Sequence, residues 1–249
     1  MIRKIFSTLT ISAALILLVS PASVLGQASE SAEPFKVGTF AVDDMPFVGL
    51  VMRDDNLIVD VADANRAMEL MPAYSSINVP DDMLGFIEQY EYGLKYRVYE
   101  VVNWLVEEEL LDGGSRPDYV HSTSDVDILA PIQYPSKVMN AAVNFYTHAC
   151  EGCSAQELEA RTRQRQEDRG VPYLFLKPTR GAIIGDGEDV VMPWGRDRIE
   201  YEVEMAIVFG KTGKYVSATR AYDHVFGYCL LYTSPSPRDG LLYRMPSSD

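Results

Sequence analysis

Residues 199–209 read IEYEVEMAIVF, an alternation of apolar and acidic side chains that predicts a long β-strand. Successive side chains of a strand point to opposite faces, so the apolar residues share one face. They are Ile199, Tyr201, Val203, Met205, Ile207 and Phe209. The other face starts with Glu200, Glu202 and Glu204 and then becomes apolar at Ala206 and Val208. We therefore expect core packing on both faces of the sheet at that end.

The acidic face of this strand predicts a cation site. Glu202 and Glu204 are two residues apart, which separates their Cα atoms by about 7 Å in a strand. Near a core, such carboxylates repel each other and lose hydration unless a cation joins them. Carboxylate oxygens suit Mg²⁺ or Mn²⁺, and Ca²⁺ is also open. The alternative is an edge strand whose acidic face is simply solvated.

A polar loop at residues 144–151, NFYTHACE, carries a second group of reactive side chains. His148 and Glu151 are three residues apart, which places them on the same side of a helical turn. A carboxylate beside an imidazole orients the ring and raises its basicity, as a general base requires. A lone histidine is more often structural than catalytic, and we expect His121 and His224 to be structural.

The bulk composition is that of a globular protein. The 249 residues are 47% hydrophobic and 23% charged, enough for one large domain or two smaller ones. The net charge of −14 argues against nucleic-acid binding, which needs a clustered basic face. A bound cation would still allow an anionic substrate to approach, because the ion is the largest local charge.

Residues 1–26 have the pattern of a cleavable signal peptide. Arg3 and Lys4 precede a short apolar run at residues 11–20, and the small or tolerated residues VLG come before Gln27. The run is shorter than the roughly 18 residues of a membrane span, so we expect secretion or a periplasmic location without a stable membrane anchor. An uncleaved anchor is the alternative.

The rest of the chain divides into a polar linker (27–34), an N-terminal domain (35–125) and a second unit (126–228). The N-terminal domain is predicted to contain an antiparallel meander followed by helices that begin near Asp82. The strands of the meander are expected at residues 35–40, 47–52 and 57–61. A GGSRP segment at residues 113–117 marks the boundary, and residues 126–132 are expected to open the second unit.

The second unit is predicted to combine short strands with one polar helix. A buried strand is expected at residues 138–143, and shorter strands at 173–176 and 190–192. Ser154 and Glu157 form a capping-box pattern that starts a helix running to Arg169. This helix is polar almost all round, so we expect it to be a mobile cover rather than part of a core.

The last 21 residues, 229–249, differ in character from the rest of the chain. They read CLLYTSPSPRDGLLYRMPSSD, with Pro235 and Pro237 where a strand is expected. The segment resembles one reading frame of a sequencing adapter, and we predict that it is artefactual; a natural Pro-rich tail is the alternative. Without Cys229, the remaining cysteines form a CxxC pair, Cys150 and Cys153, which suits a small disulfide in an exported protein or, less simply, a redox motif.

Three blocks, in order, resemble the fumarylacetoacetate hydrolase family. Residues 131–151, PIQYPSKVMNAAVNFYTHACE, resemble the family's entry to the catalytic domain, an apolar strand followed by Asn-Tyr and His-x-x-Glu. Residues 172–193, PYLFLKPTRGAIIGDGEDVVMP, resemble the next block with its Phe-x-Lys-Pro. Residues 199–228 resemble the most specific block, Glu-x-Glu followed by Gly-Lys and Gly-Tyr. Three ordered blocks are far more specific than one.

The resemblance implies an α+β, mainly β fold class: an FAH-type mixed β-roll or barrel-like catalytic domain, incomplete here, preceded by a small α+β N-terminal domain. It implies a metal bound by Glu202 and Glu204, and His148 with Glu151 as a water-activating pair on a closing lid. Tyr146 and Lys177 would bind the substrate. The implied activity is metal-dependent hydrolysis of C–C bonds in β-dicarbonyl 2-oxo acids, with a small-molecule partner and a homodimer at full length.

The chain also departs from the family pattern. A third metal ligand, an Asp, is expected near Thr233, within the segment predicted to be artefactual. We therefore expect this chain to be truncated, inactive and poorly folded, and the full gene product to be active. Decarboxylase, isomerase or lyase activity on 2-oxo acids remains open, as does a non-catalytic periplasmic binding protein.

Overall fold

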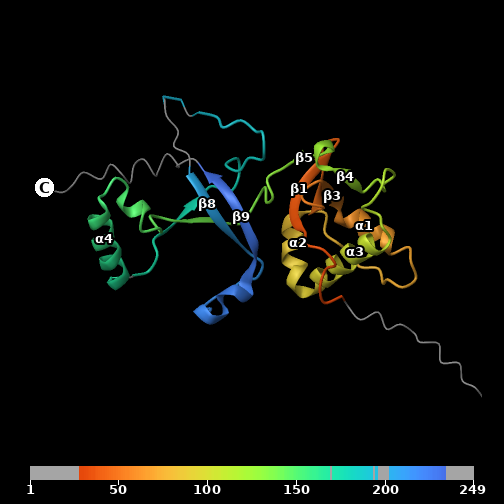
Figure 1. Ribbon diagram of the computed structural model, residues 1–249, viewed down its shortest axis with the longest axis horizontal. Helices are drawn as coiled ribbons and strands as arrows, with labels where there is room; N and C mark the ends of the chain where they lie inside the picture. Colours follow the sequence, from red (N-terminus) through yellow and green to blue (C-terminus); the bar gives the residue numbers. More distant parts are fainter. Residues whose placement is uncertain (1–27, 169, 193, 196–201, 234–249) are drawn as a thin grey trace, which may run out of the picture.

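The computed structural model describes residues 28–168, 170–192, 194–195 and 202–233. The predicted signal peptide, Glu200 and residues 234–249 of the predicted tail lie outside these ranges. The described part forms an N-terminal unit and a C-terminal unit, joined by an extended segment (Figure 1). None of its helices has the length and apolar character needed to cross a bilayer.

The N-terminal unit is built on a five-stranded sheet with the order β4-β3-β2-β1-β5. β1 (Lys36–Val42), β2 (Met45–Met52) and β3 (Leu57–Asp60) are consecutive antiparallel strands, which confirms the predicted meander. β4 (Val120–Ser122) pairs with β3, and β5 (Asp127–Ile128) pairs with β1. The segment expected to open the second unit therefore completes the first sheet.

Three helices pack against this sheet: α1 (Val61–Met68), α2 (Met83–Gln89) and α3 (Lys95–Glu107). Asp60 caps α1 by accepting hydrogen bonds from the backbone N–H groups of Ala62 and Asp63. The sequence prediction missed α1, because Val61 was assigned to the preceding strand. Sheet and helices enclose one hydrophobic core. Its fully buried side chains include Leu50, Met52, Val59, Phe86, Val98, Val101 and Leu105.

The C-terminal unit has two antiparallel pairs of strands and a single regular α-helix within its described residues. β6 (Val138–Ala141) pairs with β7 (Leu174–Lys177), and β8 (Glu202–Phe209) pairs with β9 (Val225–Thr233). Between β6 and β7 lies α4 (Ala155–Glu167), which buries no residue, as its polar sequence predicted. The strand expected at residues 190–192 is not formed, and only Asn140 of β6 is buried.

The two faces of β8 differ in a way that corrects the sequence expectation. The apolar face carries Val203, Met205, Ile207 and Phe209, which are 47–64% exposed. The opposite face carries Glu204, Ala206 and Val208, which are half-buried. The hairpin has no second layer over its apolar face among the described residues, so core packing forms on the inner face alone.

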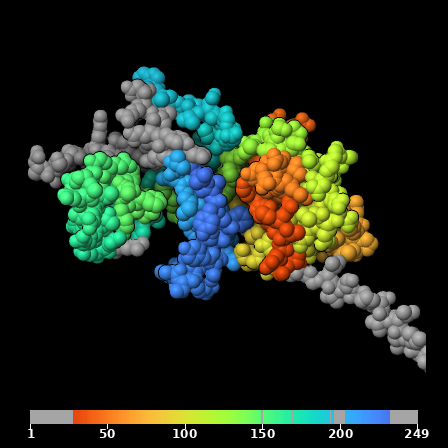
Figure 2. All heavy atoms as spheres, viewed as in Figure 1, coloured from red at the N-terminus to blue at the C-terminus, as the bar shows by residue number. Residues whose placement is uncertain are grey.

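The inner face of the β8–β9 hairpin connects the two units. The Phe226 ring packs edge-on against Tyr90 at 5.0 Å between centroids, and Val208 also contacts the N-terminal core. The Lys211 ammonium lies 3.4 Å from the Glu91 carboxylate. In Figure 2 the blue hairpin lies between the α4 segment and the N-terminal unit, so it forms the middle of the molecule.

Candidate functional site

The predicted acid–base pair is formed on a short 3-10 turn, His148–Cys150, that follows β6. His148 Nδ1 lies 2.6 Å from Glu151 Oε1, and the two side chains are 42% and 74% exposed. When Glu151 is ionised and the imidazole is neutral, Nδ1–H donates this hydrogen bond and Nε2 is left as the proton acceptor. The geometry is that of an oriented imidazole open to solvent, and the catalytic roles of both residues stay predictions.

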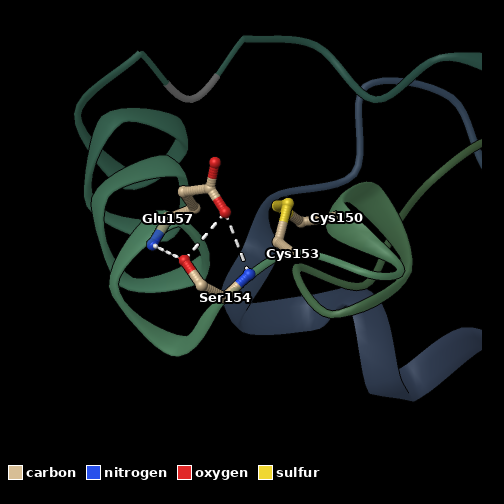
Figure 3. The surroundings of a disulfide bond; sticks show 4 residues. All are labelled: Cys150, Cys153, Ser154 and Glu157. Atoms are coloured by element: carbon tan, nitrogen blue, oxygen red, sulfur yellow. Dashed lines mark hydrogen bonds between the residues drawn. A yellow bond between two sulfur atoms is a disulfide. The ribbon is translucent and has the colours of Figure 1, made fainter.

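The segment after this turn is held by a disulfide and a helix cap. Cys150 is bonded to Cys153, with their Cα atoms 5.4 Å apart, and Cys150 is buried. Ser154 caps α4, and the Glu157 carboxylate accepts hydrogen bonds from the Ser154 backbone N–H at 2.9 Å and hydroxyl at 2.8 Å (Figure 3). These bonds lower the pKa of Glu157, the backbone bond contributing most. The predicted capping box is therefore confirmed.

Asn140 is a site residue that the sequence prediction missed. It lies on β6 with 6% of its surface exposed, and its Nδ2 donates a 2.6 Å hydrogen bond to Glu204 Oε2 on β8. The bond fixes the orientation of the Glu204 carboxylate between two strands that are distant in sequence. The available signal was an Asn inside the strand sequence VMNA, where this residue type is depleted.

Lys177 is placed on the same side of the β6–β7 sheet as Asn140. Val138 lies opposite Lys177, and Asn140 lies opposite Phe175, so alternate residues bring Asn140 and Lys177 to one face. The Lys177 Nζ lies 5.9 Å from the centre of the Phe175 ring. Tyr146, the second predicted substrate-binding residue, is half-buried in the loop before His148.

Of the two predicted metal ligands, the structure describes the side chain of Glu204 but not that of Glu202. Glu204 supplies one half-buried carboxylate. Glu202 begins β8, where its backbone pairs with Thr233, and its side chain lies outside the described residues, as does any ligand after Thr233. Within the described part of the chain, no three His, Cys, Asp or Glu side chains form a cluster that could hold a metal ion. These residues alone therefore do not complete a metal site.

The other two histidines lie away from this group. The His121 ring on β4 packs against Phe47 at 5.5 Å between centroids, within the N-terminal unit. His224 Nδ1 lies 3.3 Å from the Lys211 backbone oxygen, so the ring ties together the ends of the loop between β8 and β9. Both have packing or hydrogen-bond partners that suit the structural role expected from the sequence.

The described residues thus combine an α+β, mainly β fold with a hydrogen-bonded His148–Glu151 pair. Residues 137–239 match the family described as fumarylacetoacetate (FAA) hydrolase C-terminal. Residues 137–239 therefore belong to the fumarylacetoacetate hydrolase family. The match continues beyond residue 228, and β9 itself runs to Thr233, so the first residues of the predicted tail pair with β8.

Several curated proteins are similar to this chain. The mitochondrial oxaloacetate tautomerase FAHD2B of Homo sapiens is 33% identical over 49% of this chain and 34% of its own length. The oxaloacetate tautomerase YisK of Bacillus subtilis is 27% identical over 79% of this chain and 58% of its own length. The chain thus spans between about a third and three fifths of the length of these relatives.

Solved structures show the same fold. A fumarylacetoacetate hydrolase from Exiguobacterium antarcticum superposes with a TM-score of 0.51 at 18% identity, covering 84% of this chain and 59% of that protein. A maleylpyruvate hydrolase from Sphingobium sp. SYK-6 gives a TM-score of 0.50 at 23% identity, covering 79% and 57%. At such identities the likeness concerns architecture alone, so the reaction has to be argued from the site.

Proposed function

We propose that this chain carries part of the active site of a divalent-metal-dependent hydrolase that cleaves C–C bonds in β-dicarbonyl 2-oxo acids. Acylpyruvates and fumarylacetoacetate-like compounds are the substrate class. The observation that carries the proposal is the 2.6 Å contact between His148 Nδ1 and Glu151 Oε1. A binding protein has no need of a histidine that a carboxylate orients and that solvent can reach.

In the proposed reaction, His148 is the general base. Its Nε2 removes a proton from a water molecule, and Glu151 stabilises the imidazolium that forms. The hydroxide adds to the distal carbonyl carbon, and the C–C bond between the two carbonyl-bearing fragments breaks. The bonding electrons pass to the 2-oxo acid fragment as its enolate, and His148 returns the proton to that fragment. The products are a carboxylic acid and a 2-oxo acid.

Glu202 and Glu204 would hold the divalent cation, Mg²⁺ or Mn²⁺, with Ca²⁺ as an alternative. When bound, the cation supplies Lewis acidity toward the oxygens of the 2-oxo acid. The hydrogen bond from Asn140 supports this assignment, because it orients Glu204 as outer-shell partners orient metal ligands. Lys177, on the face shared with Asn140, would pair with the substrate carboxylate, and Tyr146 would line the site beside His148.

The helix α4 would act as the cover of this site. It follows the turn that carries His148 and Glu151, and none of its residues is buried. A segment with no core contacts opens at low free-energy cost, which suits a lid that excludes bulk water during turnover. We further propose that the protein is exported to the periplasm or secreted through its signal peptide, and that the full-length protein is a homodimer.

A second candidate reaction is tautomerisation of oxaloacetate or a related 2-oxo acid. The similarity to the oxaloacetate tautomerases FAHD2B and YisK favours it. The same base would move a proton between carbon and the enol oxygen, with no addition of water and no broken C–C bond. His148 and Glu151 serve either reaction, so the products decide between them.

The test is an assay with Mg²⁺ on an acylpyruvate, on oxaloacetate and on a dienoate. It uses this chain and the product of the gene re-amplified across residue 229. Release of a carboxylic acid and pyruvate supports the hydrolase, and faster keto–enol exchange of oxaloacetate without a new product supports the tautomerase. Release of CO₂ would identify a decarboxylase. Ligand binding that survives in His148→Ala, with no turnover by either protein, would instead indicate a binding protein.

A further inference from the structure

The turn that carries the candidate base is closed by a covalent bridge. The Cys150–Cys153 disulfide is drawn in Figure 3. In the sequence, Glu151 lies between the two cysteines, and His148 lies two residues before Cys150. Ser154, the N-cap of α4, follows Cys153 directly. The bridge therefore lies between the hydrogen-bonded pair and the start of the proposed lid, where it can affect both.

Non-covalent contacts hold this region weakly. The Glu151 side chain is 74% exposed, and α4 buries no residue. The backbone hydrogen bonds of the turn are Cys150 N–H to Thr147 O at 3.2 Å and Cys153 N–H to Cys150 O at 3.0 Å. Gly152, inside the bridged loop, has a φ of +81°, in a region that glycine enters freely. Without the bridge, the orientation of Glu151 would depend on these few contacts.

The size of the loop indicates that the bridge acts locally. The two cysteines are three residues apart in sequence. A disulfide restrains the unfolded chain in proportion to the logarithm of the loop that it closes, so a short loop adds little to global stability. What this bridge does restrict is the backbone on either side of Glu151, which sets where the carboxylate can meet the imidazole.

We propose that Cys150 and Cys153 are positioning residues: their disulfide holds Glu151 against His148, and reduction of the bridge lowers turnover. The inference rests on the proposed function, in which His148 is the general base. A dithiol reductant would donate two electrons and two protons, leaving two protein thiols and a cyclic disulfide of the reductant. The reverse exchange, with a disulfide oxidant of an oxidising compartment, would restore the bridge.

The experiment compares the oxidised chain, the dithiol-reduced chain and the double variant Cys150→Ser/Cys153→Ser. The first readout is the ¹⁵N chemical shift of the His148 ring, which reports whether Nδ1 or Nε2 carries the proton; His148→Ala assigns the signal among the three histidines. We expect the Nδ1–H tautomer in the oxidised chain and a mixture in the other two. This readout needs no substrate, so it stands apart from the proposed function.

The second readout is steady-state turnover of whichever substrate is active. We expect kcat to fall about tenfold on reduction while KM changes little, because a misplaced base weakens the chemical step. In His148→Ala, reduction should have no further effect on kcat. Cys229→Ser is the matched control: it removes the third cysteine, on β9, and should respond to the reductant as the wild type does.

An unchanged His148 tautomer after reduction would overturn the inference, whatever the activity. An unchanged kcat in a protein whose tautomer does change would also overturn it, because the bridge would then be purely structural. Absence of turnover on every substrate, both by this chain and by the product of the gene re-amplified across residue 229, would count against the proposed function instead. The tautomer comparison would still decide whether the bridge positions Glu151.

Discussion

Two helices of the same length show how differently the two units of this protein are stabilised. α3 and α4 each have 13 residues. α3 buries six side chains, among them Val98, Val101 and Leu105, in the core of the N-terminal unit. α4 buries none; a capping box closes its N-terminus, and the Cys150–Cys153 disulfide directly precedes that cap. Tertiary packing is what usually stabilises a helix, so we expect α4 to be more mobile than α3.

The candidate site lies in the unit that has the less extensive core. His148, Glu151, Asn140, Lys177 and Glu204 all lie in the C-terminal unit, where few side chains are buried. The N-terminal unit contributes the rings of Phe86 and Tyr90, against which Phe226 packs. The molecule thus separates a well-packed N-terminal unit from a loosely packed unit that holds the candidate site, an arrangement that would suit the proposed lid movement.

Loss of the base should have the largest effect and should leave the platform intact. We expect His148→Ala to lower kcat by about 10²- to 10⁴-fold, the usual contribution of general-base catalysis. The unfolding transition should not shift, because the ring is exposed. Steady-state kinetics and thermal unfolding check the two parts. His224→Gln is the control and should retain turnover; equal losses in the two variants would contradict the assignment.

Loss of an aromatic ring from the N-terminal core should lower the stability of the protein. Phe86, on α2, is completely buried in the core of the N-terminal unit, and Phe86→Ala should lower the free energy of unfolding by about 3–5 kcal/mol. Denaturant titration followed by circular dichroism measures this change. Phe145→Ala removes a ring that is 69% exposed in the C-terminal unit and should change stability by less than about 0.5 kcal/mol. Similar losses for both would mean that the units share one core.

A smaller effect is expected at the junction between β6 and β8. Asn140→Leu keeps a side chain with the same branching but removes the donor to Glu204, and we expect affinity for Mg²⁺ or Mn²⁺ to fall about 10- to 100-fold. Titration calorimetry on the product of the gene re-amplified across residue 229 measures it. Met139→Leu, on the exposed face of the same strand, is the matched control. Unaltered affinity in Asn140→Leu would separate Asn140 from the metal site.

The smallest expected effect is on the pH dependence of stability, through the contact of Glu91 with Lys211 between the two units. Burial alone would raise the pKa of Glu91, but hydrogen bonds and charge from Lys95 and Lys211 lower it overall from its usual 4.5. A lowered folded-state pKa contributes stability that is present above the unfolded pKa and lost as the pH falls through the folded value. Stability should therefore decline below about pH 4.5 in a manner that depends on Glu91.

Unfolding measured across this range in Glu91→Gln tests the prediction. The variant should lose part of the acid-dependent decline, and Lys211→Ala should lose a smaller part, because Lys95 still pairs with Glu91 at 3.1 Å. Glu88→Gln, at an exposed carboxylate on α2, is the control. A pH profile in Glu91→Gln that matches the wild type would show that the pair does not couple the units.

Local patterns predicted most of the elements and one part of the site. The alternation in β8, the meander β1–β3, the capping box of α4 and the proximity of His148 and Glu151 all follow from spacings of two to four residues. Pairings between strands that are distant in the sequence were not predicted. The pairing of β5 with β1 joins Phe40 to Ile128, and no local signal marks which sheet so short a strand will join.

The sequence by itself determined the match of residues 137–239 to the family, through its ordered motif blocks. It also determined that α3 is amphipathic, that α4 is polar, and that His148 contacts Glu151, because these features depend on residues three or four positions apart. Only the tertiary structure decided that Asn140 donates to Glu204 and that the apolar face of β8 is the exposed one. Both depend on which strands meet. That choice is made by the burial of side chains from distant parts of the chain, which period and composition do not specify.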